Sequence, residues 1–155
     1  MPAMNAGEAD EGRAPAVCNC LAIRQAARLI TQIYDTELAP AGLRITQYSL
    51  LAALNRLGPS SVQELADDQV LDRSTLGHNL RPLEAAKLVV LAVDKSDRRA
   101  KRLTLSAKGR RKLEEARPLW LGAQARFEGQ YGEAESKDLR ATLRQVVDRT
   151  AALVS

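Results

Sequence analysis

Residues 61–89, SVQELADDQVLDRSTLGHNLRPLEAAKLV, contain two short helical patterns separated by a break. Ser61 and Glu64 form a capping box that begins the first helix, because each side chain can satisfy an unpaired backbone amide of the other residue. Asp72 is placed to cap the second helix, which we expect over residues 73–86. Two consecutive short helices joined by a tight turn predict a helix-turn-helix.

A charged stretch flanked by two short apolar runs follows this helix-turn-helix. Residues 88–93, LVVLAV, and residues 102–105, RLTL, have the composition of strands. The polar segment DKSDRRAK between them is typical of a hairpin tip. Residues 59–62 are expected to add a brief third strand. A helix-turn-helix followed by a hairpin predicts a winged helix.

Amphipathic helices precede and follow the predicted helix-turn-helix and hairpin. Apolar residues at helical spacing predict helices over residues 18–38, 46–57, 107–130 and 136–153. Thr46 is expected as the N-cap of the second of these helices and Ser106 as the N-cap of the third. Two prolines fall inside predicted helices, at positions 82 and 118, and are expected to bend or shorten them.

The chain is therefore expected to be mainly α-helical with one small β-hairpin wing, divided into two regions. Residues 46–106 form the predicted winged helix-turn-helix lobe, and residues 17–45 and 107–155 form a helical dimerisation region. Residues 1–16, rich in Ala, Gly, Pro and acidic groups, are expected to be a disordered tail. The flanking helices carry more apolar surface than one small lobe can cover, which predicts a homodimer.

The amino-acid composition limits the kinds of protein that this chain can be. The 155 residues include 45% hydrophobic but only 3% aromatic side chains, which favours packed helices in one domain. Two cysteines do not make a disulfide framework, and no apolar run has the length of a membrane span or forms a signal-peptide core. We therefore expect a soluble, cytoplasmic protein with no membrane partner. The net charge of +4 is compatible with a polyanionic partner.

The sequence offers no catalytic constellation. Its only histidine, His78, lies on the second helix of the predicted helix-turn-helix, and no cysteine or serine is paired with it in a known motif. There is no glycine-rich phosphate loop, Cys/His metal cluster or H-E-x-x-H motif. We therefore expect no enzymatic activity, no cofactor and no metal. A thiol peroxidase that uses Cys20 is the one enzymatic alternative that a residue of the sequence supports.

The second helix of a helix-turn-helix enters the major groove of DNA. Helical periodicity turns Leu76, Leu80 and Leu83 toward the core. The side chains on the other faces are mostly short or hydrogen-bonding, as base and phosphate contacts require, although a solvated face without a ligand is the alternative. Gly77 weakens the helix by about 1 kcal/mol relative to alanine, and close approach to a DNA backbone is one use for it. The predicted DNA contacts of this helix are Arg73, Ser74, Thr75, His78, Asn79 and Arg81.

The predicted hairpin tip is strongly cationic. Residues 94–102 hold five basic and two acidic side chains, a net charge of +3. A cationic loop beside a helix-turn-helix can reach phosphates or the adjacent minor groove, whereas a solvated charged turn is the alternative. Asp97 is expected to pair with a nearby arginine and to hold the tip rigid. The predicted DNA contacts of the tip are Lys95, Arg98, Arg99 and Lys101.

A family resemblance rests on the same two segments. Residues 93–109, VDKSDRRAKRLTLSAKG, resemble the wing of the MarR-type transcriptional regulators, and residues 61–89 are similar to the helix-turn-helix of that family. The resemblance extends over residues 18–153. The positions that match the wing signature are Asp97, Arg99, Thr104 and Gly109.

The resemblance implies how such a protein works. MarR-type regulators are homodimers in which the first and last two helices of each subunit interlock. Their two winged helices meet a pseudo-palindromic operator in double-stranded DNA, and the arginine at the Arg99 position enters the minor groove. Small ligands or oxidants that act near the junction of the two regions weaken DNA binding. We therefore interpret the sequence as that of a repressor released by a small organic effector.

Two cysteines open the first predicted helix, in AVCNCLAIRQAARLI. The N-terminal end of a helix stabilises a thiolate. The organic-hydroperoxide branch of the MarR family has a reactive cysteine at this place, and an ungapped alignment puts Cys20 on it and Tyr34 on a supporting tyrosine. Arg24 and Ile45 stand where that branch has an aromatic side chain and a second tyrosine. Thiol-based sensing by Cys20 is thus one hypothesis, and packing of Cys18 and Cys20 as small apolar side chains is another.

A small organic effector, such as an aromatic acid, is the other regulatory hypothesis. Fold-level analogy places its pocket between the first, second and long helices. Arg24 is expected to pair with a carboxylate there. A winged helix that binds protein instead of DNA is a further alternative. The candidate effector or redox residues are Cys18, Cys20, Arg24, Tyr34 and Tyr48.

Overall fold

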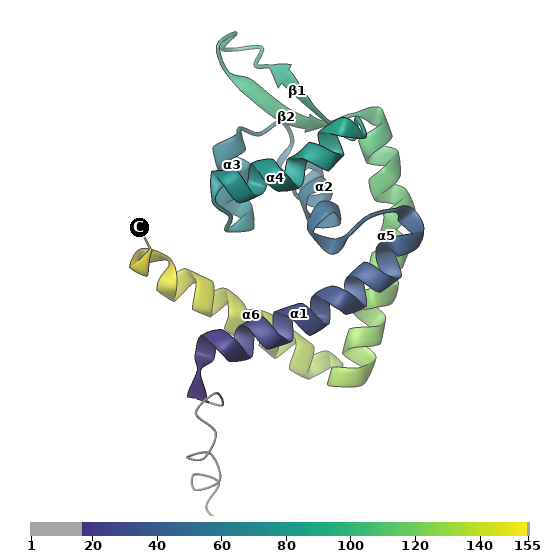
Figure 1. The fold of residues 1–155 in the computed structure, drawn as a ribbon, viewed down its shortest axis with the longest axis vertical. Helices are drawn as coiled ribbons and strands as arrows, with labels where there is room; N and C mark the ends of the chain where they lie inside the picture. The colour runs from purple at the N-terminus through teal and green to yellow at the C-terminus, as the bar shows by residue number, and fades with distance from the viewer. Residues whose placement is uncertain (1–16, 155) are drawn as a thin grey trace, which may run out of the picture.

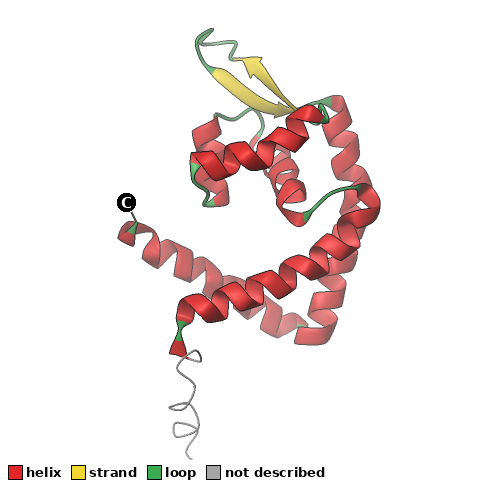
Figure 2. Cartoon of the chain, viewed as in Figure 1, coloured by secondary structure: helices red, strands yellow, loops and turns green. Residues whose placement is uncertain are grey.

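The computed structural model describes residues 17–154, so the predicted tail at residues 1–16 lies outside the described residues. A small lobe with a protruding hairpin stands at one end, and long helices form the other end (Figure 1). Within residues 17–154, the hairpin is the only sheet (Figure 2). The elements are α1 (Asn19–Leu38), η2 (Ala39–Ala41), α2 (Ile45–Leu57), α3 (Val62–Gln69), α4 (Arg73–Ala85), β1 (Val89–Val93), β2 (Lys101–Leu105), α5 (Ala107–Tyr131), α6 (Glu133–Thr150) and η3 (Ala151–Leu153). The predicted fold class, a mainly α chain with one small hairpin, is confirmed.

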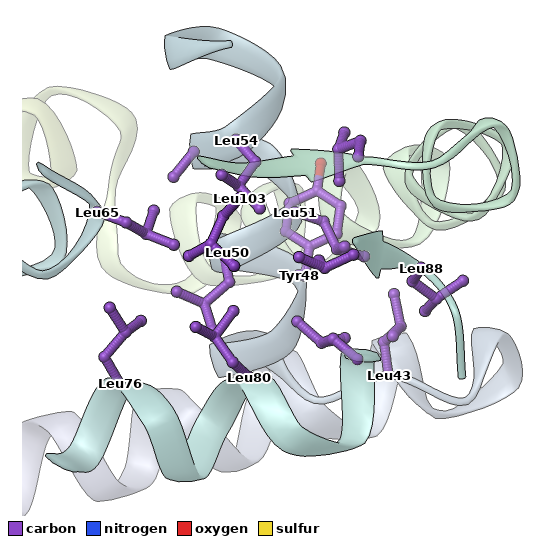
Figure 3. Packing of buried hydrophobic residues seen from close by; sticks show 14 of the residues in the cluster. Leu43, Tyr48, Leu50, Leu51, Leu54, Leu65, Leu76, Leu80, Leu88 and Leu103 are labelled. Carbon is purple, nitrogen blue, oxygen red and sulfur yellow. The ribbon is translucent and has the colours of Figure 1, made fainter. Parts of the chain in front are cut away.

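The core of the lobe is built from leucines of α2, α3, α4 and β2. Leu50 of α2 lies between Leu65 of α3 and Leu80 of α4, and Leu103 closes the cluster from the hairpin (Figure 3). All four side chains are almost completely buried. The face of α4 expected to turn inward does so, with exposures of 0% for Leu76, 3% for Leu80 and 1% for Leu83. Because these three leucines fix the rotation of α4, they also fix which side chains face outward.

Local caps begin three of the helices where the sequence predicts. In the capping box, the Ser61 hydroxyl accepts from the Glu64 amide at 3.1 Å and the Glu64 carboxylate accepts from the Ser61 amide at 2.7 Å. The Asp72 carboxylate accepts from the Thr75 amide at 2.8 Å at the start of α4. The Ser106 hydroxyl accepts from the amide of residue 109 at 2.9 Å at the start of α5. Each cap satisfies a backbone donor that has no partner inside its helix.

The start of α2 differs from the prediction. Thr46 is not the N-cap: α2 begins at Ile45, and Arg44 is the capping residue. The Asp35 carboxylate of α1 accepts from the Ile45 amide at 2.7 Å, and the Gln47 side chain accepts from the Arg44 amide at 2.9 Å. The prediction was wrong because the first free amide of α2 is satisfied by a carboxylate from another helix, which no local pattern shows.

The hairpin is antiparallel and is tied to the rest of the lobe. Val89 lies opposite Leu105 at its base. The third strand expected at residues 59–62 is reduced to one bridge, in which Ser60 donates to Leu103 at 3.0 Å and accepts from it at 2.7 Å. The wing therefore continues directly from the lobe core.

The last two helices are long and are only partly covered by their own chain. α4 and α5 continue through the prolines at positions 82 and 118, and α6 begins three residues before the expected start at 136. α5 runs from the hairpin side to the far end of the molecule, and α6 turns back from there and passes behind α1 (Figure 1). Leu143, Val146 and Val147 on α6 are each more than a third exposed. Among residues 17–154, no helix is both long and apolar enough to cross a bilayer.

Candidate nucleic-acid interface

The outward face of α4 carries the side chains that the sequence selects for DNA. Arg73, Ser74, Thr75, His78 and Arg81 are all exposed, whereas Asn79 is half-buried toward α2. Neither arginine of this set forms an ion pair within residues 17–154. The face therefore presents two uncompensated guanidinium groups beside short hydrogen-bonding side chains.

Asp72 and Thr75 form a second contact that the sequence did not predict. Besides capping α4, the Asp72 carboxylate accepts from the Thr75 hydroxyl at 2.6 Å. The hydroxyl and amide of Thr75 hold the pKa of Asp72 below its usual range. Because the Thr75 proton is already donated, its hydroxyl can offer only its oxygen lone pairs to another partner.

The first acidic residue of the hairpin tip organises the turn. The Asp94 carboxylate accepts from the Ser96 hydroxyl at 2.6 Å and from the Ser96 amide at 2.8 Å. Its other oxygen accepts from the Arg102 guanidinium at 2.8 Å. These contacts, those from Ser96 first, hold the pKa of Asp94 far below its usual range. Asp94 is thus an anchor of the turn.

Asp97 supports the tip in a way different from the one expected. Its carboxylate accepts from the Arg99 backbone amide at 2.9 Å, and its carbonyl accepts from the Ala100 amide at 3.0 Å. The ion pair with an arginine belongs to Asp94 and Arg102 instead. The short Asp97 side chain reaches the backbone two residues on, which is the local bond typical of aspartate in turns.

Arg102 joins the wing to α3. Besides its bond to Asp94, its guanidinium donates to the Glu64 carboxylate at 2.6 Å. Asp94 first and then Glu64 raise the pKa of Arg102 above its ordinary value. The sequence counted Arg102 in the cationic tip but did not reveal this role, because Glu64 lies on a different element. Four basic side chains of the tip stay exposed without an ion pair in the described chain: Lys95, Arg98, Arg99 and Lys101.

The candidate sensor residues are not brought together in this chain. Cys18 and Cys20 are exposed at the start of α1, as is Arg24 one turn further on. Cys18 is the N-cap, and its sulfur accepts from the Leu21 amide at 3.4 Å. Tyr34, toward the other end of α1, is buried and donates to Gln124 of α5.

Tyr48 belongs to a separate cavity between α2, the end of α3 and α5. Its ring stacks on Trp120, with centroids 5.8 Å apart and planes 14° apart. The cavity has a volume of about 430 Å³. Its polar and aromatic lining includes Tyr48, Ser49, Asn55, Gln69, Arg117 and Trp120. The sequence pointed to Tyr48 here but missed Arg117 and Trp120, because these lie far along the chain on α5.

The comparisons with known proteins agree with this geometry. The MarR family model matches residues 41–100, which run from the end of η2 to the hairpin tip. The crystal structure of the Mycobacterium tuberculosis transcriptional regulator MosR in complex with DNA is 36% identical, with a TM-score of 0.78. It is matched over 88% of this chain and 98% of that one. The chain belongs to the MarR family. Family and fold are those of winged-helix transcriptional regulators.

Two further relatives are similar over different lengths. The chain is 35% identical over 79 residues to YxaD of Bacillus subtilis, an uncharacterised HTH-type transcriptional regulator. That match covers 51% of this chain and 55% of YxaD, so it spans about half of that relative. The structure of Bordetella bronchiseptica BpsR, whose DNA binding is regulated by 6-hydroxynicotinic acid, is 25% identical, with a TM-score of 0.77. It is matched over 86% of this chain and 95% of that one.

Proposed function

We propose that this MarR-family chain is a transcriptional repressor that binds double-stranded DNA through α4 and the hairpin. The observation that carries the proposal is the exposed, unpaired cationic surface that α4 and the hairpin tip share. α4 presents Arg73 and short hydrogen-bonding side chains, which suits base and phosphate contacts in the major groove. The tip presents Arg99 on a turn held by Asp97, which suits insertion into the adjacent minor groove. MosR, the DNA-bound relative, supports the same use of this fold.

We propose that the operator is pseudo-palindromic and is bound by a homodimer. The support is the apolar surface left uncovered on the helical region. Ile23 and Leu29 of α1, Leu121 of α5 and Val147 of α6 are each more than 40% exposed. Exposed apolar side chains spread over three helices favour burial against a second copy, and a twofold dimer reads a twofold site.

We propose that a small aromatic carboxylate regulates DNA binding from the cavity beside Tyr48 and Trp120. The stacked rings offer an apolar face to an aromatic ligand, and Arg117 on the same wall offers a partner for a carboxylate. The cavity lies between α5 and the helices α2 and α3 of the lobe. A ligand bound in it can therefore shift the lobe relative to α5. BpsR, which responds to 6-hydroxynicotinic acid, supports this ligand class.

Thiol-based sensing is the second candidate for regulation. Cys18 and Cys20 are both exposed within the chain, so an oxidant can reach them, and Cys18 caps α1. Addition of organic peroxide to the reduced protein separates the two candidates. Release of DNA by peroxide that is lost in Cys20→Ser favours the thiol, whereas release by an aromatic carboxylate that is lost in Arg117→Gln favours the cavity.

The DNA-binding proposal is tested by fluorescence anisotropy with the full chain and the DNA that flanks its own gene. Arg99→Ala is expected to weaken binding strongly with little change in thermal stability, because a wing tip buries little apolar surface. Lys137→Gln removes one charge from the start of α6, far from the hairpin, and is the matched control. Equal affinity of the Arg99→Ala variant and the wild type would show that the wing does not bind DNA.

A further inference from the structure

A polar cleft lies between the start of α2 and the outer face of α4. It has a volume of about 390 Å³. In Figure 1 the hairpin rises above α4, whereas the connection from α1 into α2 lies below it. The cleft is therefore on the side of α4 away from the wing. Its lining residues that carry charge or hydrogen-bonding groups are Arg44, Thr46, Gln47, His78, Asn79 and Arg81.

The charge in this cleft is one-sided. Two guanidinium groups, of Arg44 from α2 and Arg81 from α4, line it together, and no acidic residue is part of the lining. Neither forms an ion pair in the part of the chain that the structure describes. The nearby acidic group, Asp35, approaches the start of α2 from α1 and is engaged with the Ile45 amide at 2.7 Å. The two arginines thus line one cleft, and its lining holds no acidic residue.

The cleft is also prearranged by the backbone. The Gln47 side chain accepts from the Arg44 amide at 2.9 Å, and Asp35 holds the next residue, so the stem of Arg44 begins from a fixed position. Arg81 lies on the turn of α4 between Leu80 and Leu83, which are both buried and set its direction. An arginine on each wall can donate paired hydrogen bonds to a phosphate group.

We propose that this cleft binds a phosphodiester group of the DNA backbone, on the flank of α4 opposite the wing. The proposal rests on the DNA-binding function proposed above and adds Arg44, which no sequence pattern selected. With the wing on one side and the cleft on the other, α4 is held at two points and its depth in the major groove is fixed. The contact reads no base, so it strengthens binding to every sequence alike.

The lining distinguishes this cleft from the cavity beside Trp120. It contains no aromatic ring other than the imidazole of His78, and Pro82 is its one apolar side chain. An aromatic effector would find a charge partner here but no tyrosine or tryptophan ring on which to stack. A phosphodiester needs only the charge and the donors.

The test uses the full chain and a mixed-sequence DNA duplex, because a backbone contact does not depend on the operator. Arg44→Gln is expected to weaken binding about tenfold and to reduce the slope of log K against log salt by about one. Arg81→Gln, on the other wall, is expected to do the same. Lys137→Gln is the control and is expected to leave both quantities unchanged. Circular dichroism of each variant shows whether α2 and the rest of the fold are retained.

Three results would overturn the proposal, and they differ from one another. If Arg44→Gln and Arg81→Gln keep the wild-type affinity and salt slope while Arg99→Ala loses affinity, the cleft does not bind the backbone, although the DNA-binding function stands. If inorganic phosphate stabilises the wild type but not Arg44→Gln, with DNA affinity unchanged, the cleft binds a free anion instead. If the wild-type chain does not bind duplex DNA at any salt concentration, the proposed function itself fails.

Discussion

Arg102 ties the hairpin to the helix-turn-helix through two side-chain ion pairs. Its guanidinium bridges Asp94 at the end of β1 and Glu64 on α3, at 2.8 and 2.6 Å. Glu64 also belongs to the capping box that begins α3. One side chain therefore couples the hairpin to the first helix of the helix-turn-helix. Its contacts hold the wing in position, while the exposed cations around it are the side chains proposed to bind DNA.

Arg102→Gln is expected to loosen the hairpin and to weaken DNA binding although Arg102 itself is not proposed to touch DNA. Loss of the cation removes the group that the Asp94 and Glu64 carboxylates share, so the hairpin is no longer tied to α3 by this side chain. Hydrogen exchange of the β1 and β2 amides measures the effect and should become faster. Lys101→Gln is the control, because it removes the same charge from an exposed neighbour in the wing that makes no ion pair with Asp94 or Glu64. Equal exchange rates in Arg102→Gln and the wild type would remove Arg102 from the positioning role.

Acid is expected to destabilise the lobe because four carboxyl groups have lowered pKa values in the folded state: Glu64, Asp68, Asp72 and Asp94. The unfolded chain binds more protons than the folded chain below the ordinary carboxyl pKa of about 4. Their contribution is therefore complete above that pH and is lost as the pH falls through the lower, folded-state values. Thermal melts from neutral pH to pH 3 measure the fall, which should be smaller in Asp94→Asn. An identical pH profile in that variant would contradict the assignment.

At the scale of elements, the sequence predicts features that depend on neighbouring residues and misses features that depend on contacts between distant elements. The caps at Ser61, Asp72 and Ser106 use partners three residues away, and all three are where the sequence places them. The start of α2 depends on Asp35 of α1, and the wing tie depends on Glu64 of α3. Neither partner follows from helical or strand periodicity. Arg117 and Trp120, which line the cavity beside Tyr48, were missed for the same reason, since they lie far along the chain on α5.

Alanine substitutions at two helical glycines, Gly109 on α5 and Gly77 on α4, are expected to have opposite effects on stability. A Cβ at Gly109 would lie 2.0 Å from the Leu88 carbonyl oxygen, so α5 passes directly against the start of β1. Gly109→Ala must displace backbone and is expected to lower the free energy of unfolding by about 2 kcal/mol. A Cβ at Gly77 meets no atom within 4 Å. Gly77→Ala is therefore expected to raise the free energy of unfolding by about 1 kcal/mol.

Urea denaturation of the two alanine variants measures both changes. A stable Gly109→Ala protein would show that the contact of α5 with the base of the wing is looser than the structure indicates. Gly77→Ala carries a second expectation, because Gly77 lies on α4 beside His78. If a DNA backbone approaches this turn closely, the variant should be more stable and yet bind DNA less tightly. Unchanged DNA affinity would leave Gly77 without a role in binding.

At the scale of the molecule, the leucine core joins the lobe to the adjoining parts of α1 and α5, while the rest of the helical region is left largely uncovered. The lobe buries a continuous leucine core, whereas α1, α5 and α6 leave large apolar side chains exposed. The division into a DNA-binding lobe and a dimerisation region stays a prediction, because a single chain carries no partner. The uncovered surface is the physical reason to expect one.

Leu143→Arg is expected to separate the proposed dimer. Leu143 lies on α6, is 40% exposed, and neighbours Val146 and Val147 on the same uncovered surface. A charge there cannot be buried against a second copy without a large desolvation cost. Sedimentation equilibrium should give a dimer for the wild type and a monomer for the variant, with weaker DNA binding in the monomer. A wild type that is monomeric at micromolar concentration would refute the dimer.

The central claim, that two winged lobes of a homodimer read one operator, is tested most directly by a DNase footprint on the DNA that flanks the gene. The account predicts one protected region containing an inverted repeat, with half-site centres about 10 base pairs apart or a multiple of that. It also predicts that the footprint disappears in Arg99→Ala and persists in Lys137→Gln. A uniform loss of cleavage without a bounded site, or a footprint that Arg99→Ala leaves intact, would contradict it.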